Sequence, residues 1–193
     1  MNSESRPNTW VIEEARAYLR ASQLIEQHAK NDDLALYWPA AMNAALASEL
    51  YLKSFLVESD PDNPGDNEDP QGYLKLVSDL PRNKHDLFAL YNAIPTDLAE
   101  QLRKTSKRLS PGFQLEKWIK DCSTLFVGTR YPYEAKSTRD FDTDVLRLAP
   151  HLDHIVSVMS EEFDAAKILQ RVRQGQETVH SAADVRKDLD LDD

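Results

Sequence analysis

The chain has 193 residues and a formal net charge of −10, and 41% of its residues are hydrophobic. This length suits one domain with short tails, and no run approaches the ~18 apolar residues of a membrane-spanning helix. The acidic balance disfavours broad electrostatic capture of nucleic acid. The single cysteine, Cys122, excludes an internal disulfide and a cysteine-based metal site. The polar first residues are unlike a secretory signal, so we expect a cytoplasmic protein that is not in a membrane.

The first part of the chain predicts two helices. We expect residues 1–8 to form a flexible N-terminus, with Asn8 as the cap of a helix that begins near Trp10. A second helix should run from about Leu34 to Val57. Alanine and leucine make it apolar almost all round, which is typical of a helix at the centre of a bundle.

Residues 59–82 are expected to form an acidic loop. The segment is rich in proline and aspartate, a composition that disfavours regular structure. A short helix is possible within it, over Tyr73–Leu80.

Two helices are predicted after this loop. The first begins near Asn83–Lys84 and ends at Pro95, because proline cannot continue a helix. Thr96 can cap the second, a short basic helix that ends near Leu109. The cations of this region have two interpretations, a solvated helix face or a phosphate-facing surface. They are Arg103, Lys104, Lys107 and Arg108, with Lys117 and Lys120 soon after.

Two further helices complete the pattern. One should span about Phe113–Val127, with Gly128 as its natural stop. Asp142 or Thr143 can cap the final long helix, which Pro150 should kink or restart.

Together these elements predict an all-α fold, an antiparallel bundle of four or five helices. The bundle should occupy residues 9–174, interrupted by the acidic loop at 59–82. Residues 175–193 should form a disordered acidic tail.

Polar residues embedded in apolar patterns stand out at three places. They lie in the segments ASELYLK (residues 47–53), KHDLFALY (residues 84–91) and TRYPYE (residues 129–134). Buried polar groups need hydrogen-bonding partners, which usually come from other elements. The three segments therefore predict one shared polar cleft.

Each of these polar groups has a structural and a functional interpretation. Glu49 and Lys53 are four residues apart, in the favourable order for a helical ion pair. They could form a simple bridge, or Lys53 could contact a phosphate while Glu49 orients Lys53 or Arg130. At the next segment, Asp86 could simply favour a helix start and His85 could bond a neighbouring loop.

The third segment has the same ambiguity. Arg130, Tyr131 and Tyr133 could stack on a nucleotide and clamp it. They could equally lock their loop onto the bundle.

The order of these motifs resembles the HEPN family of nucleotide-binding helical bundles. The matching segments are Ala44–Leu56 in a central helix, the step His85-Asp86-Leu87, and Arg130-Tyr131-Pro132 after a later helix, followed by a final long helix. The resemblance covers roughly residues 10–170. It implies a helical bundle, homodimerisation, and a cleft that binds nucleotides or RNA.

The same resemblance implies a cellular setting and possible partners. HEPN-like proteins serve in stress response, phage defence and toxin–antitoxin systems, so an antitoxin or a nucleotidyltransferase is a possible partner. Some members are metal-independent ribonucleases, in which an arginine is followed by a histidine after about four to six residues. Others lack that pair and act as nucleotide-binding or scaffold modules.

Two pairs in this chain fit the ribonuclease spacing. Arg173 and His180 fall at the predicted tail, so we discard them. Arg147 and His154 lie in the final helix, where the histidine could act as general base on a ribose hydroxyl while the arginine stabilises the phosphorane. Pro150 lies between them. His151 and His154 have metal-ligand spacing but no third ligand, so we expect no metal and no cofactor.

The sequence therefore predicts a protein that binds a nucleotide or RNA through Glu49, Lys53, His85, Arg130 and Tyr131. Asp86 and Tyr133 flank these residues and are included in the predicted site. One alternative is a metal-independent endoribonuclease that uses Arg147 and His154. Another is a non-catalytic dimeric scaffold.

Overall fold

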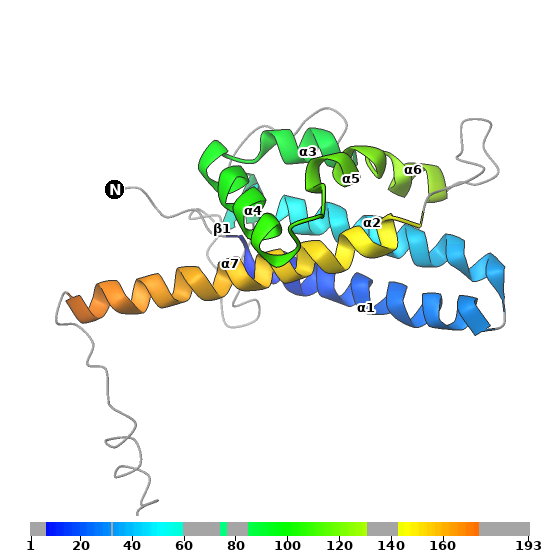
Figure 1. Ribbon diagram of the computed structural model, residues 1–193, viewed down its shortest axis with the longest axis horizontal. Helices are drawn as coiled ribbons and strands as arrows, with labels where there is room; N and C mark the ends of the chain where they lie inside the picture. Colours follow the sequence, from blue (N-terminus) through cyan, green and yellow to red (C-terminus); the bar gives the residue numbers. More distant parts are fainter. Residues whose placement is uncertain (1–6, 32, 60–73, 77–84, 131–142, 174–193) are drawn as a thin grey trace, which may run out of the picture. The chain divides into compact units, whose positions relative to one another are not determined.

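The computed structural model describes residues 7–31, 33–59, 74–76, 85–130 and 143–173 (Figure 1). Their contacts divide the chain into two compact units, Met1–Met159 and Ser160–Asp193. The predicted tail, the predicted N-terminus up to residue 6 and most of the acidic loop lie outside the described residues. The residues discussed below as a site all belong to the first unit.

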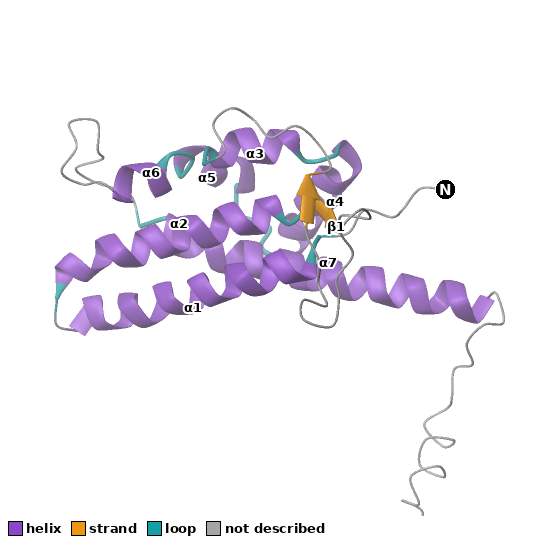
Figure 2. Ribbon diagram, turned by 180° about the vertical axis from the view of Figure 1, so that it is seen from behind, coloured by secondary structure: helices purple, strands orange, loops and turns teal. Residues whose placement is uncertain are grey.

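The described residues are mostly helical, which confirms the all-α class (Figure 2). The elements are α1 (Thr9–Asn31), a 3₁₀ helix η1 (Leu34–Leu36), α2 (Tyr37–Lys53), β1 (Val57–Ser59), β2 (Leu74–Leu76), α3 (Leu87–Ala93), α4 (Thr96–Leu109), α5 (Leu115–Asp121), α6 (Leu125–Arg130) and α7 (Val145–Arg173).

Helices α1 and α2 lie side by side (Figures 1 and 2). The Asn8 side chain accepts a hydrogen bond from the Val11 N–H at 3.2 Å, as predicted for the cap of α1. In α2 the alanines that face the core are fully buried; they are Ala40, Ala41, Ala44, Ala45 and Ala47. Their small size lets α1 approach closely, and the buried Ser22 hydroxyl of α1 donates to the Ala40 carbonyl at 2.8 Å.

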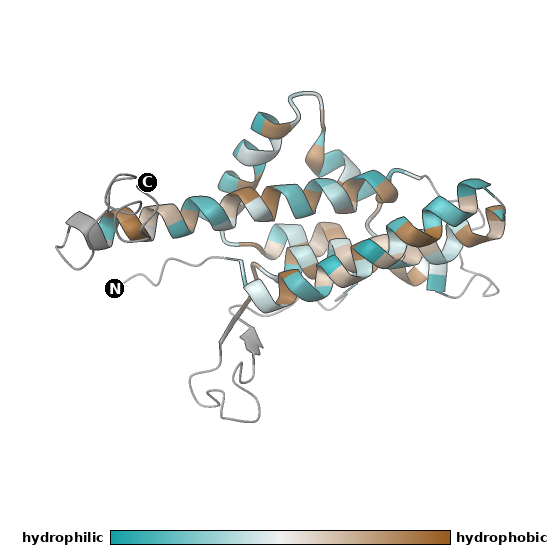
Figure 3. Ribbon diagram, turned by 90° about the horizontal axis from the view of Figure 1, so that it is seen from below, coloured by the Kyte–Doolittle hydropathy of each residue, from teal (hydrophilic) through white to brown (hydrophobic). Residues whose placement is uncertain are grey.

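The alternation of hydrophilic and hydrophobic residues along α1 is visible in Figure 3. It reflects one face packed on the core and one face in solvent. The largest fully buried side chains come from α2 and the turn after it, from α3, α4 and α5, and from the first part of α7. They are Tyr51, Leu52, Leu56, Leu87, Leu90, Leu98, Leu102, Ile119, Leu148, Leu152, Ile155 and Met159. One apolar core therefore joins these elements within the first unit.

The strands correct two predictions. Val57–Ser59 pairs antiparallel with Leu74–Leu76, with Val57 opposite Leu76. The second helix therefore ends at Lys53 and not at Val57, and the short helix considered over Tyr73–Leu80 is wrong for residues 74–76. Pairing between segments separated along the chain satisfies backbone groups that local patterns assign to a helix.

The predicted helix over Phe113–Val127 is in fact two helices, α5 and α6, and α6 continues through Gly128 to Arg130. The break lies at Ser123, whose carbonyl accepts from the Leu87 N–H at 3.0 Å. Its hydroxyl accepts from the Phe88 N–H at 2.9 Å. Ser123 therefore leaves the helical path to satisfy the first N–H groups of α3.

Helix boundaries elsewhere differ by small amounts. Thr96 is the first residue of α4, and Pro95 occupies the capping position without a side-chain hydrogen bond. Proline has no N–H to satisfy and fixes its own φ, so it suits this position. Pro150 lies inside α7, so the chain does not restart there.

Candidate functional site

A buried carboxylate joins two of the three sequence segments. Glu49 lies on α2 with only 2% of its side chain exposed, and its Oε1 lies 2.5 Å from the Lys53 Nζ. The His85 Nδ1 lies 3.0 and 3.1 Å from the two carboxylate oxygens. His85 lies two residues before Leu87, the first residue of α3, so α2 and the start of α3 meet at this point. We call Glu49, Lys53 and His85 the carboxylate cluster.

Lys53 and His85 lie on the exposed side of the carboxylate cluster. The Lys53 side chain is 21% exposed and the His85 side chain is 44% exposed, against 2% for Glu49. An isolated buried carboxylate would be very costly, so the Lys53 ammonium compensates its charge and the His85 ring adds a hydrogen bond to it. The carboxylate in turn fixes where these two side chains stand at the surface.

Helix α6 brings the third segment to the same place. The Phe126 ring packs against the His85 ring, with their centroids 5.3 Å apart. The Arg130 guanidinium lies 6.0 Å from the centroid of the same Phe126 ring. Phe126 thus lies in contact with both His85 and Arg130. Sequence reasoning missed Phe126 because it appeared only as a core position of the predicted helix.

The Asp86 carboxylate accepts hydrogen bonds from neighbouring groups of the protein itself. Its carboxylate accepts from the Ala89 N–H at 2.9 Å, which makes Asp86 the cap of α3. It also accepts a hydrogen bond from the Ser123 hydroxyl. The structure therefore supports the structural interpretation of Asp86, which fixes the start of α3 next to His85. Tyr131 and Tyr133 lie outside the described residues.

The predicted catalytic pair of the final helix lies in a different environment. Arg147 and His154 are both exposed on α7. The Arg147 guanidinium lies 4.8 Å from the centroid of the Trp118 ring. The Trp118 ring packs on the Phe113 ring, with their centroids 4.4 Å apart. This cation–π contact accounts for the position of Arg147 without a ligand.

His151, rather than His154, is the buried histidine of α7. Its ring stacks on Phe113 at 3.9 Å, and its Nε2 lies 2.8 Å from the Ser106 hydroxyl of α4. Burial, followed by the nearby charge of His154, lowers the pKa of His151. His151 is thus a neutral side chain that ties α7 to α4. Among the described residues, no group of three or more potential ligands could hold a metal ion.

A second polar network, which sequence reasoning missed, joins α1, α2 and α7. The Tyr51 hydroxyl donates to Asp153 at 3.0 Å, and the Arg16 Nε donates to the same carboxylate oxygen at 2.9 Å. Arg16 also donates to the Ser157 hydroxyl at 2.8 Å. Burial, followed by the charge of Asp153, raises the pKa of Tyr51. Tyr51 could not be recognised from the sequence because it fits the apolar pattern of α2.

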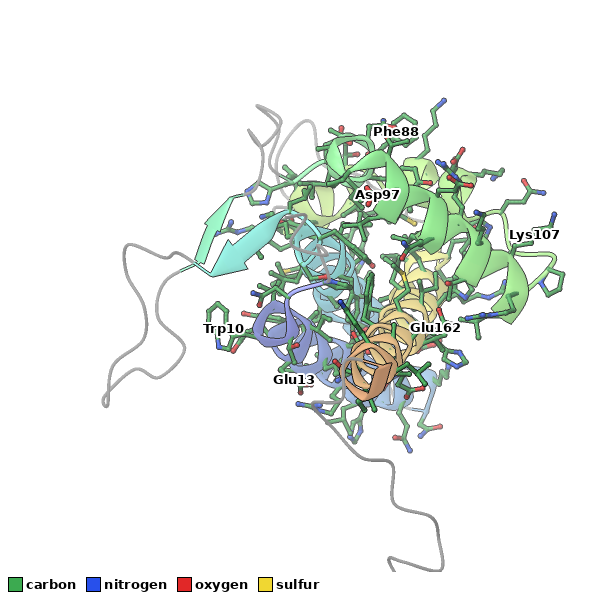
Figure 4. All side chains as sticks on the ribbon, turned by 90° about the vertical axis from the view of Figure 1, so that its left-hand side faces the viewer. Trp10, Glu13, Phe88, Asp97, Lys107 and Glu162 are labelled. Atoms are coloured by element: carbon green, nitrogen blue, oxygen red, sulfur yellow. The ribbon has the colours of Figure 1, made fainter. Side chains whose placement is uncertain are left out.

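The basic residues of α4 and α5 are partly neutralised by neighbours. Lys104 pairs with Glu100 at 2.7 Å, and Lys117 pairs with Asp121 at 2.5 Å. Lys107 lies on the outer side of α4 (Figure 4). This arrangement fits a solvated helix face as well as it fits a phosphate-facing surface.

Comparison of the chain with protein-family models, with curated proteins and with solved structures found no match. Within the part of the chain that the structure describes, the helices are too short or too polar to cross a membrane.

Proposed function

We propose that this protein binds a phosphate-bearing ligand, a nucleotide or the end of an RNA strand, at the carboxylate cluster and the adjoining Phe126 and Arg130. The proposal follows the HEPN-like order of motifs, in which these segments form the ligand site. It includes a HEPN-like arrangement of the helices and a homodimer, and a setting in stress response, phage defence or a toxin–antitoxin system.

The observation that carries the proposal is the buried Glu49 carboxylate with Lys53 and His85 on its exposed side. Lys53 is a compact point charge that suits phosphate oxygens. Phe126 could supply an aromatic surface for a base, since base–aromatic stacking contributes about 1–3 kcal/mol and tolerates any base. Ammonium, guanidinium and aromatic groups together form the usual set for nucleotide binding.

The proposal also explains why a charged group occupies the apolar helix α2. A buried ion pair adds little net stability compared with apolar residues of similar volume. A buried Glu49 would therefore gain little stability for its desolvation cost if its role were only structural. It does hold Lys53 and His85 in fixed positions.

Binding affinity tests the proposal. Fluorescence anisotropy with a labelled single-stranded RNA, and calorimetry with ATP and GTP, would compare the wild type with Lys53→Met. Loss of a charge-assisted hydrogen bond costs about 1.5–3 kcal/mol, so we expect affinity to fall roughly 10- to 100-fold.

The matched control is Lys30→Met. Lys30 forms the same kind of helical pair, with Glu26 at 2.6 Å on α1. Lys30→Met removes one positive charge, as Lys53→Met does. We expect this variant to bind within about twofold of the wild type. Equal losses in both variants, or no binding of RNA, ATP or GTP by the wild type, would refute the proposal.

A further inference from the structure

The contact between Glu49 and His85 determines which ring nitrogen of His85 carries hydrogen. An ionised carboxylate only accepts hydrogen bonds, and both oxygens of Glu49 lie within 3.1 Å of the His85 Nδ1. The Lys53 ammonium donates to the same carboxylate at 2.5 Å. Nδ1 therefore carries the proton, and in the neutral ring Nε2 keeps its lone pair.

His85 uses Nδ1 for its contacts with Glu49, and its side chain is partly exposed. Within the described residues, every hydrogen bond of His85 goes through Nδ1. The His85 side chain is 44% exposed, whereas the Glu49 side chain is 2% exposed. A buried carboxylate that holds the Nδ1 of a partly exposed histidine is the carboxylate–histidine arrangement that orients a general base.

The buried histidine of α7 provides a contrast. His151 is 9% exposed, and its Nε2 is engaged with the Ser106 hydroxyl. The ring is stacked on Phe113 as well. His151 is therefore built into the packing, whereas His85 is oriented by a carboxylate and presented at the surface.

We propose that His85 is a general base for cleavage of single-stranded RNA, oriented by Glu49. This inference rests on the proposed function, because it requires that RNA binds at the carboxylate cluster. It differs from the predicted Arg147 and His154 pair in placing the chemistry between α2 and α3.

The reaction is an internal phosphoryl transfer that needs no metal and no second substrate. The His85 Nε2 takes the proton of a ribose 2′-hydroxyl, and the 2′ oxygen forms a bond to the adjacent phosphorus. The bond from phosphorus to the 5′ oxygen breaks, and that oxygen takes a proton from water. The products are a 2′,3′-cyclic phosphate and a 5′-hydroxyl end, and His85 returns its proton to solvent.

The neighbouring cations have a defined role in this step. Negative charge grows on the phosphorane oxygens, so a nearby ammonium or guanidinium stabilises the transition state. Lys53 shares the Glu49 carboxylate with His85, and Arg130 lies against the Phe126 ring that His85 also contacts. Glu49 is a positioning residue, since it acts through His85.

The experiment measures cleavage and binding on the same labelled RNA in EDTA. The wild type should produce cyclic-phosphate ends, and the 2′-O-methyl form of the RNA should be bound but not cleaved. His85→Ala should lower the cleavage rate by at least about 100-fold, the usual contribution of a general base. Anisotropy should show a much smaller loss of affinity, at most about tenfold, which corresponds to the loss of one hydrogen bond. Added imidazole should restore part of the cleavage in this variant.

The control variants are His28→Ala and His154→Ala, which remove exposed histidines from α1 and α7 and should cleave at the wild-type rate. Far-UV circular dichroism checks that His85→Ala folds, and imidazole rescue reports on the same active fold. Glu49→Gln should also lose cleavage.

Three outcomes would overturn the inference. RNA that is bound but not cleaved by the wild type would refute the general base and leave the binding proposal intact. RNA that is not bound would refute both. Cleavage that persists in His85→Ala and is lost in His154→Ala would place the chemistry on α7.

Discussion

At the scale of single residues, Tyr51 illustrates how one hydroxyl can join distant helices. It donates to Asp153, which also accepts from Arg16, so α1, α2 and α7 meet at one carboxylate. Burial opposes the charge of Arg16, but the hydrogen bonds to Asp153 and Glu13 outweigh it and raise the pKa of Arg16. Tyr51 and Arg16 therefore both donate to the Asp153 carboxylate, and Arg16 compensates its charge.

Tyr51→Phe should destabilise the fold modestly. The substitution removes one donor from Asp153 and leaves the ring packing unchanged, so we expect a loss of about 0.5–1.5 kcal/mol. For a chain of this size that corresponds to a melting temperature about 2–4 °C lower per kcal/mol. Thermal unfolding followed by circular dichroism measures it. Tyr18→Phe, at a residue 37% exposed, is the control and should melt like the wild type; equal shifts in both would refute a specific role for the Tyr51 hydroxyl.

His151 should make stability fall in mild acid. Its pKa is below the ordinary 6.5 in the folded protein, chiefly because of burial. Below about pH 6.5 the unfolded chain therefore binds this proton more readily than the folded chain, and stability is lost until the folded pKa is passed. Urea unfolding at pH 7.5 and at pH 5.5 should show the decline.

Substitution of His151 tests whether this residue causes the loss of stability in mild acid. His151→Gln should reduce the difference in unfolding free energy between the two pH values, whereas His28→Gln on α1 should leave it unchanged. If His151→Gln retained the whole difference, another group would be responsible.

Some residues of the candidate site could be predicted from the sequence and others could not. Glu49, Lys53 and His85 were recognisable because charged groups in an apolar pattern require partners, and the structure places all three in contact. The hydrogen bond of Tyr51 and the contacts of Phe126 with His85 and Arg130 were not recognisable, because both side chains fit the core pattern. Nothing in the local pattern shows which way such rings face.

At the scale of elements, the break between α5 and α6 fixes the position of His85. Ser123 binds the first N–H groups of α3 and the Asp86 carboxylate, and His85 directly precedes this junction. A sequence window around Ser123 contains no helix-breaking signal. Its partners Phe88 and Asp86 lie 35 and 37 residues earlier in the chain, so the break could not be predicted locally.

Ser123→Ala should therefore affect both stability and ligand binding. The variant leaves the Phe88 N–H and one side of Asp86 without their partner, at a cost of about 1–3 kcal/mol. Because α3 then holds His85 less firmly, RNA affinity should fall as well. Ser157→Ala is a control: it removes a hydroxyl that contacts Arg16, away from α3.

Chemical denaturation and RNA anisotropy measure the two effects of Ser123→Ala. Ser157→Ala should lose stability without losing affinity. If Ser123→Ala bound RNA as tightly as the wild type, the link between the α5–α6 break and His85 would be wrong.

Helix boundaries were predictable where the signal is local. The Asn8 cap of α1 and the span of α4 up to Leu109 follow from nearby residues. The strands β1 and β2 were missed because each is only three residues long and is defined by its partner. Pairing of this kind depends on tertiary structure, which a local pattern does not contain.

At the scale of the whole molecule, composition established the all-α class. Few glycines and many alanines and leucines favour helices, and the described residues are mostly helical. The HEPN-like arrangement, the homodimer and the cytoplasmic location stay predictions. Light scattering would distinguish the 22.0 kDa monomer from a dimer of twice that mass.

The charge of the molecule sets the conditions under which binding should be measured. A net charge of −10 repels phosphates at long range, so binding depends on local cations and weakens with added salt. Buffers of low and stated ionic strength are therefore required for every affinity comparison.

The most direct test of the central claim is an NMR measurement of the ring nitrogens of His85 with and without ATP. We predict hydrogen on Nδ1, set by Glu49, and a change in the Nε2 signal as ATP is added, with no change at His28. Hydrogen on Nε2 in the free protein, or a His85 signal unaffected by ATP and by short RNA, would contradict the account.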